Sequence, residues 1–213
     1  MNKKKASPII VGILFAVAAV MIVTGTIGGV KAAPLITNAR DYEAEMQLTE
    51  IGIGITENGS LVADGGELMT TLKSDFKIGK TYEEKLAVTN NGGINEYVRV
   101  TVYKYWTDEN GKDVTLDPSL INVNYVEGDG WTINADESTK ERTVLYYSGV
   151  IAPGESSTEF VDKVTIDGKV SKAISEDKTL DYDGVTFHIQ VVADGVQDHN
   201  GDAAMTSAWG HTN

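Results

Sequence analysis

Histidine, acidic and aromatic side chains are the residues of this chain that could carry out chemistry. The three histidines, His188, His199 and His211, are not spaced to share one face of a helix, and the chain has no His-Glu-x-x-His motif. It also has no Gly-x-Ser-x-Gly elbow and no Walker-type loop. The absence of cysteine excludes thiol catalysis, disulfides and thiolate metal sites. The sequence therefore predicts no catalytic residue, no cofactor and no zinc centre.

One spacing resembles a metal site. Asp198, Asn200 and Asp202 place oxygen atoms at alternate positions, as at the start of a calcium loop. Ala203 stands where that loop needs glycine, however, and Trp209 stands where it needs a bidentate glutamate. Half a motif in an acidic chain makes a weak calcium candidate, so the preferred interpretation is a turn that caps a C-terminal helix.

Aromatic side chains on strand-like segments suggest a sugar-binding face as an alternative function. These residues are Tyr97, Tyr103, Tyr105, Trp106, Tyr146 and Tyr147. Aromatic residues on strands more often stabilise a sheet through cross-strand pairs. Packing is therefore the preferred interpretation.

The element around which these residues are organised is Glu96–Trp106. Its side chains alternate between an apolar row and a second row rich in threonine and tyrosine, which is typical of a strand with one face in a core. The apolar row consists of Val98, Val100 and Val102. Tyr82–Thr89 shows the same alternation, and Asn90–Gly93 between them has turn chemistry. We expect the two strands to form a hairpin.

Further strand patterns follow at fairly regular intervals, separated by turn signals such as Asn58-Gly59. They are Met46–Ile55 (with a phase change near Thr49), Ile121–Tyr125, Trp131–Ile133, Arg142–Ser148, Phe160–Ile166 and Val185–Ala193. Short helical elements are expected at Leu116–Ile121, where proline follows aspartate, and at Asn200–Trp209 with Asn200 or Asp202 as the cap. About eight strands without long helices predict an all-β fold, a jelly-roll-like antiparallel sandwich with short helices.

The N-terminus has the pattern of a signal peptide. Lys3–Lys5 supply positive charge, Ile9–Val23 is an uncharged run, and small residues precede Ala32. Cleavage is expected between Ala32 and Ala33. The alternative is an uncleaved anchor, because residues 8–30 carry no charge over a length that can span a bilayer.

The chain is acidic throughout its remaining length. It has 18 Lys and Arg against 31 Asp and Glu, a net charge of −13. Removal of residues 1–32 takes away four lysines and no acid, which leaves −17. Such a surface repels nucleic acid and anionic membranes, so neither is an expected partner, apart from the membrane that the signal segment meets before cleavage.

Several stretches together resemble the TasA/camelysin family, exported fibre-forming proteins of Gram-positive biofilm matrices. They are the signal peptide, LITNAR, AVTNNGGINEYVRVTVYKYW, STKERTVLYYSGVIAPGES and VADGVQDHNGDAAMTSAWG. The resemblance covers essentially the whole chain, and it depends on patterned strands and not on a catalytic signature.

The resemblance implies a secreted subunit that assembles head to tail, in the extracellular matrix or at the cell surface. It divides the chain into a signal peptide (1–32), an N-terminal extension (33–45) and a jelly-roll domain (46–213). In TasA-like fibres one subunit takes up the freed N-terminal segment of the next as a strand. The matching residues here are Ala33, Pro34, Leu35, Ile36, Thr37, Asn38, Ala39 and Arg40. The implied partners are other copies of the chain, a signal peptidase and an accessory matrix protein.

Two other functions stay open at this point. Camelysin-type members have been labelled metallo-endopeptidases, but this chain has no recognisable zinc motif, so that activity is not carried over. A monomeric surface module that binds sugar or protein is the third possibility.

The first prediction concerns processing. N-terminal sequencing of exported protein should give a start at or next to Ala33, because the small residues before it suit a signal peptidase. Recovery of the protein only from membranes, with residues 1–30 intact, would instead support the anchor.

Overall fold

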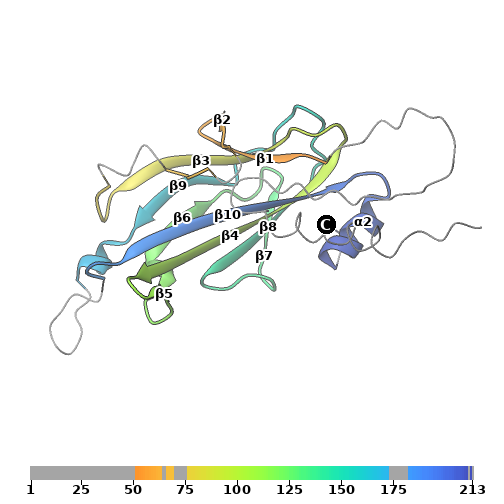
Figure 1. The fold of residues 1–213 in the computed structure, drawn as a ribbon. Coiled ribbons are helices and arrows are strands. Elements are labelled where there is room, and N and C mark those ends of the chain that lie inside the picture. Colours follow the sequence, from red (N-terminus) through yellow and green to blue (C-terminus); the bar gives the residue numbers. More distant parts are fainter. Residues whose placement is uncertain (1–50, 64–65, 70–75, 173–181, 211, 213) are drawn as a thin grey trace, which may run out of the picture.

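The computed structural model describes residues 51–63, 66–69, 76–172, 182–210 and 212 (Figure 1). The strands are β1 (Ile53–Glu57), β2 (Ser60–Leu61), β3 (Thr81–Asn90), β4 (Glu96–Asp108), β5 (Gly111–Asp113), β6 (Ile121–Tyr125), β7 (Trp131–Asn134), β8 (Arg142–Tyr147), β9 (Val161–Ile166) and β10 (Thr186–Gln197). The helical elements are the 3₁₀ turns η2 (Pro118–Leu120) and η3 (Gly168–Ser171) and the α-helix α2 (Gly201–Trp209).

These strands form two sheets that face one another. One has the order β2-β1-β3-β9-β6, and the other has the order β10-β4-β8-β7, with β5 paired to the end of β4. Every pair of described strands is antiparallel. Figure 1 shows the two layers, with α2 near one end and β5 near the other. The prediction of an all-β, antiparallel sandwich is confirmed.

The core lies between the sheets, and the valine row of β4 is at its centre. Val98, Val100 and Val102 are fully buried, and they belong to one apolar cluster with β3 residues such as Leu86 and Val88 from the opposite sheet. The alternation of apolar and polar residues determines this result, because successive side chains of a strand face opposite sides.

The predicted hairpin between β3 and β4 is wrong. The two strands lie in different sheets, and the residues between them cross from one layer to the other. The Asn90 side chain stabilises this crossing: its amide donates to the carbonyls of Ile94 and Ile151, and its Oδ1 accepts from the Gly92 N–H at 2.9 Å. The carbonyl of Gly52 accepts from the N–H groups of Asn91 and Gly92. The asparagine and glycine residues here turn the chain from one sheet to the other. The same residue types also form hairpin turns, so residue type alone does not distinguish the two connections.

Other local predictions are confirmed. Asn58 and Gly59 have φ of 51° and 81°, the left-handed pair that a two-residue hairpin requires, and they join β1 to β2. Asp117 caps η2, accepting from the Ser119 N–H at 3.0 Å. The short strands β2 and β5 are additional to the eight predicted, and β10 continues to Gln197.

The C-terminal helix is confirmed, and Asn200 is its N-cap residue, one of the two that the sequence offered. Asn200 occupies the cap position with φ of 54°, and its side chain makes no capping hydrogen bond. Met205 and Trp209 on α2 bury themselves against Val144 and Tyr146 on the outer face of the second sheet. α2 therefore covers a small second core outside the sandwich.

Replacing Val100 tests the assignment of the core. Val100→Asp should destabilise the fold by about 3–5 kcal/mol, because it leaves a charge without a partner between the sheets. That is a large part of the roughly 5–15 kcal/mol that stabilises a domain, so urea unfolding should show a strongly lowered midpoint or no folded protein. Tyr103→Asp, on the opposite face of β4 where the side chain is exposed, serves as the control. Equal loss in both variants would contradict the assignment.

Candidate functional site: the free edge of β10

β10 is a long strand whose pairing is continuous on one side. Each of its twelve residues pairs with a residue of β4, from Thr186 opposite Thr107 to Gln197 opposite Glu96. Val191 and Ala193 face the core and are buried. Twelve residues in one unbroken register fix the position of this strand.

The other side of β10 has no strand partner among the described residues. In an antiparallel strand the N–H and C=O groups of alternate residues point to either side, so one row of β10 backbone groups has no strand partner in the described part of the chain. The other edge strands are much shorter: β2 has two residues, β7 has four and β6 has five. β10 is the long open edge of this part of the chain.

The sequence of β10 lacks several features that usually protect an edge strand. Natural sheets protect long edges with lysine, proline, bulges or very short strands. β10 contains neither lysine nor proline, and its register against β4 has no shift. Its one acidic residue, Asp194, is neutralised by Arg99 of β4. An unprotected edge of this length is a template for the addition of another strand.

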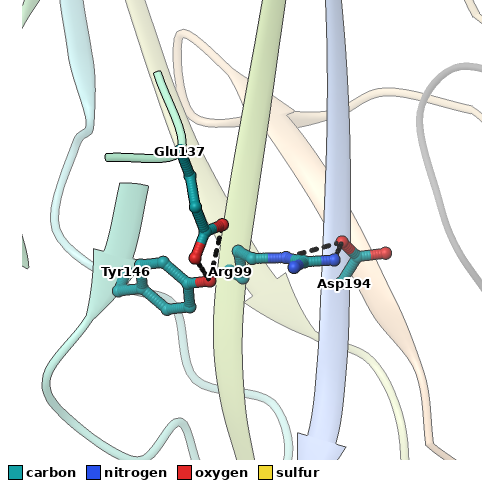
Figure 2. A network of polar contacts seen from close by, with 4 residues as sticks. All are labelled: Arg99, Glu137, Tyr146 and Asp194. Carbon is teal, nitrogen blue, oxygen red and sulfur yellow. Dashed lines mark hydrogen bonds and ion pairs between the residues drawn. The ribbon is translucent and has the colours of Figure 1, made fainter. Parts of the chain in front are cut away.

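A polar network on the outer face holds β10 in place (Figure 2). Arg99 donates to Asp194 from Nε at 3.1 Å and from Nη2 at 2.8 Å, and its guanidinium lies 5.5 Å from the ring centroid of Trp209. The hydroxyl of Tyr146 donates to the carboxylate of Glu137, with both oxygens at 3.1 Å. The network joins β10, β4, β8 and α2, so the edge is presented by a fixed scaffold.

The N-terminal segment joins the described fold beside the C-terminal end of β10. A Cβ added to Gly195 would lie 2.5 Å from a side-chain carbon of Ile53 and 3.0 Å from Oε2 of Glu96, so β1 lies directly against β10 here. Glu96 is fully buried, and its Oε1 accepts from the Gly52 N–H at 2.9 Å. The carboxyl group of Glu96 thus anchors the point where residues 1–50 enter the sandwich.

Burial raises the pKa of Glu96 from 4.5 to about 7, although the hydrogen bond from Gly52 acts in the opposite direction. Its Oε2 has no hydrogen-bond partner among the described residues. A second buried acid, Glu84 on β3, has a pKa raised to about 8, first by burial and then by the neighbouring carboxyl of Glu57. The fold therefore holds two carboxyl groups that bind protons near neutral pH.

A pair of carboxyl groups with raised pKa is a feature of many active sites, and Glu57 with Glu84 must be considered as one. The cavity beside Glu84 is about 10 Å³ and is otherwise lined by apolar side chains such as Leu68, Met69 and Val102. This volume suits about one water molecule and no substrate. The pair is part of the packed interior.

The residues of the predicted assembly and processing sites lie outside the described part of the chain. This applies to the donor segment Ala33–Arg40 and to the cleavage site between Ala32 and Ala33. Within the described residues, no helix is long and apolar enough to span a bilayer.

The weak calcium candidate lies at the start of α2. Asp198 accepts from the side-chain amide of Asn95 at 3.1 Å, and its carbonyl accepts from the Gly201 N–H. Asn200 is exposed in the left-handed conformation, and Asp202 is exposed in the first helical turn. In the part of the chain that the structure describes, no three acidic, histidine or cysteine residues gather as metal ligands.

The aromatic residues are mostly engaged in packing, as the sequence predicts. Tyr146 and Trp209 meet edge to face at 5.6 Å, and Tyr97 lies against Gly201 of α2. Tyr105 stacks on His188 at 4.9 Å, and the His188 Nε2 lies 2.8 Å from the Thr107 hydroxyl. Trp106 is buried against Tyr182 and Tyr147 packs on Trp131, so Tyr103 is the one exposed residue of the six.

Sequence reasoning did not identify the two features that define this site. The strand character of β10 is visible in the sequence, but its position at an edge depends on which strands become its neighbours. Glu96 lies two residues before Val98, so its side chain faces the same side of β4 as the valine row. This spacing is the sequence signal that its carboxyl group faces the core.

The fold and the site define an antiparallel β-sandwich with one long, unprotected edge strand. Protein-family models, curated proteins and solved structures give no match to this chain.

The buried acids predict a pH dependence of stability. Because folding raises the pKa of Glu96 from 4.5 to about 7, the folded chain keeps a proton that the unfolded chain releases. The free energy of unfolding should then fall as the pH rises through this window, by up to about 3 kcal/mol from Glu96. Glu96→Gln keeps an acceptor for Gly52 and removes the titration, so it should raise Tm at pH 8 much more than at pH 5.

Glu83→Gln provides the matched control, because Glu83 lies next to Glu84 but is exposed. Thermal unfolding at several pH values would measure both variants. A Glu96→Gln variant that loses stability equally at every pH would contradict this assignment.

Proposed function

We propose that this chain is an exported structural subunit of extracellular fibres, which polymerises head to tail by strand addition like the TasA/camelysin proteins it resembles. The observation that carries the proposal is the free edge of β10, twelve residues long and without protecting charge or proline. In this proposal the sandwich is a jelly roll, and export by a signal peptidase releases Ala33 as the mature N-terminus.

The donor is the segment Ala33–Arg40 of another copy. Its eight residues fit within the length of β10, and each added pair satisfies backbone groups that are otherwise unpaired. Leu35 and Ile36 are neighbours, so in an added strand they face opposite sides of the sheet. Each contributes roughly 1.5–3 kcal/mol when buried, before the cost of ordering the segment.

The place where the segment leaves its own domain supports assembly between copies. Ile53 lies beside Gly195, at the end of β10 next to α2, so the described chain begins two residues before this point. A segment added along the β10 edge of another copy joins two sandwiches through two different surfaces. Head-to-tail contacts of this kind can repeat from copy to copy without forming a closed ring. Repetition produces a filament in the extracellular matrix or at the cell surface, with an accessory matrix protein as a further partner.

Removal of the donor tests the proposal. A mature chain without residues 33–40 should stay folded and monomeric, because the donor contributes little to its own core. Leu35→Asp combined with Ile36→Asp should stop fibre growth, since one of the two carboxylates would enter the core-facing side of the edge without a partner. Leu61→Asp, at an apolar residue that is 58% exposed on β2, is the control that should still polymerise. Electron microscopy and light scattering would measure growth, and thermal unfolding would measure stability.

The absence of cysteine allows a direct test of the acceptor. Ile36→Cys should form intermolecular disulfides when combined with a single cysteine at His188, Gln190 or Val192 of β10, according to the register. A cysteine at Asn124 on β6, the edge of the other sheet, should give none. Unchanged fibres from the truncated chain, or cross-links at β6 alone, would contradict strand addition to β10.

A further inference from the structure

An open hollow lies at the end of the sandwich opposite α2. Its volume is about 480 Å³. It is lined by Leu116, Asp117, Leu120, Lys169, Lys172 and Tyr182. We call this surface the end hollow.

The end hollow combines two lysines and the carboxylate of Asp117 with apolar surface, in a chain of net charge −13. The Lys169 side chain is 76% exposed, with its ammonium 3.9 Å from Asp167, and Lys172 is exposed as well. Leu116 and Leu120 are half-buried at its floor, and Val114 nearby is 78% exposed. A surface of this kind suits a segment that carries both carboxylates and apolar side chains.

The end hollow is continuous with the beginning of the β10 edge. Tyr182, four residues before Thr186, packs against Trp106 at 4.9 Å, and its hydroxyl accepts from the Asp117 N–H at 3.1 Å. The indole N–H of Trp106 donates to the carbonyl of Asp117 at 3.0 Å. A chain that leaves the β10 edge at Thr186 therefore arrives at the end hollow.

The ten residues that follow the donor have matching chemistry. Residues 41–50, DYEAEMQLTE, contain four acids and no base, together with one tyrosine, one methionine and one leucine. They connect Arg40 to Ile51, where the described sandwich begins. Fully extended they reach about 33–36 Å, enough to connect two neighbouring sandwiches.

Direction decides whether these residues meet the end hollow. Every pair of described strands is antiparallel, and antiparallel pairs outnumber parallel ones in proteins about two- to threefold. A donor antiparallel to β10 runs from the Gln197 end towards Thr186, and its eight residues begin opposite Ala193 when Arg40 lies opposite Thr186. We infer that the end hollow receives residues 41–50 of the copy whose residues 33–40 are added to β10. This inference rests on the function proposed above.

The consequence is a defined arrangement of subunits. Residue 51 of the donating copy lies at the α2 end of its sandwich, whereas the end hollow lies at the opposite end of the accepting copy. The α2 end of one sandwich therefore faces the end hollow of the next, and all copies point in the same direction along the fibre.

Two peptides separate this inference from the proposed function. The acceptor is the mature chain carrying Leu35→Asp and Ile36→Asp, which keeps it from polymerising, and fluorescence anisotropy measures the binding of peptides 33–40 and 33–50. Peptide 33–50 should bind about tenfold more tightly at low salt, since several exposed charge pairs add. The advantage should shrink towards 1 M salt, where the screening length is about 3 Å.

Charge reversal in the acceptor identifies the surface. Lys169→Glu with Lys172→Glu should remove the advantage of peptide 33–50 and leave the binding of peptide 33–40 unchanged. Lys85→Glu with Lys163→Glu makes the same change of charge on exposed residues of β3 and β9, and it should preserve the advantage. Circular dichroism would verify that both double variants fold.

Each outcome has a distinct meaning. If peptide 33–50 binds no more tightly than peptide 33–40, or if both double variants weaken it equally, the end hollow is not the acceptor, and strand addition to β10 still stands. If neither peptide binds, strand addition itself fails, and this inference fails with it.

Discussion

The pairing of β4 with its neighbours is the constraint on which the rest of the structure depends. β4 pairs with β10 along twelve residues and with β8 and β5 on its other side, while its valine row fills the space between the sheets. Backbone hydrogen bonds and apolar burial thus act on the same residues. Because β8 and β5 occupy one side of β4, β10 pairs on the other side and becomes the last described strand of its sheet.

Two carboxyl groups are buried in this fold, although burial of a carboxyl group costs free energy that burial of an apolar side chain does not. Glu96 and Glu84 occupy core-facing positions of their strands, and burial makes both hold protons near neutral pH. Glu96 compensates in part by binding the N–H of Gly52, at the point where the N-terminal segment enters. A neutral apolar residue would leave that N–H without an acceptor. The carboxyl group of Glu96 therefore fixes the origin of the segment that we propose as the donor.

Charge and edge geometry together make the proposed assembly selective. The acidic surface keeps copies apart through repulsion, so association needs contacts that outweigh it. A free edge provides backbone hydrogen bonds that any extended chain could use, and on its own it would be unselective. In the proposed arrangement the two lysines and the apolar surface of the end hollow favour a segment with acidic and apolar side chains immediately after the donor strand. Such an arrangement favours the chain's own N-terminal segment over other extended peptides.

The sequence by itself determined the strands, their buried faces and several local structures. Alternation identified the valine row of β4, Asn58-Gly59 identified a turn, and Asp117 with Pro118 identified a short helical turn, because each signal acts within a few residues. Only the tertiary structure decided that β3 and β4 lie in different sheets and that β10 is an edge. It also decided that hollow-lining residues more than fifty positions apart, such as Leu116 and Lys169, lie together. Each of these outcomes depends on which distant strands become neighbours, and the pattern within one strand is the same whether one or both of its edges are paired.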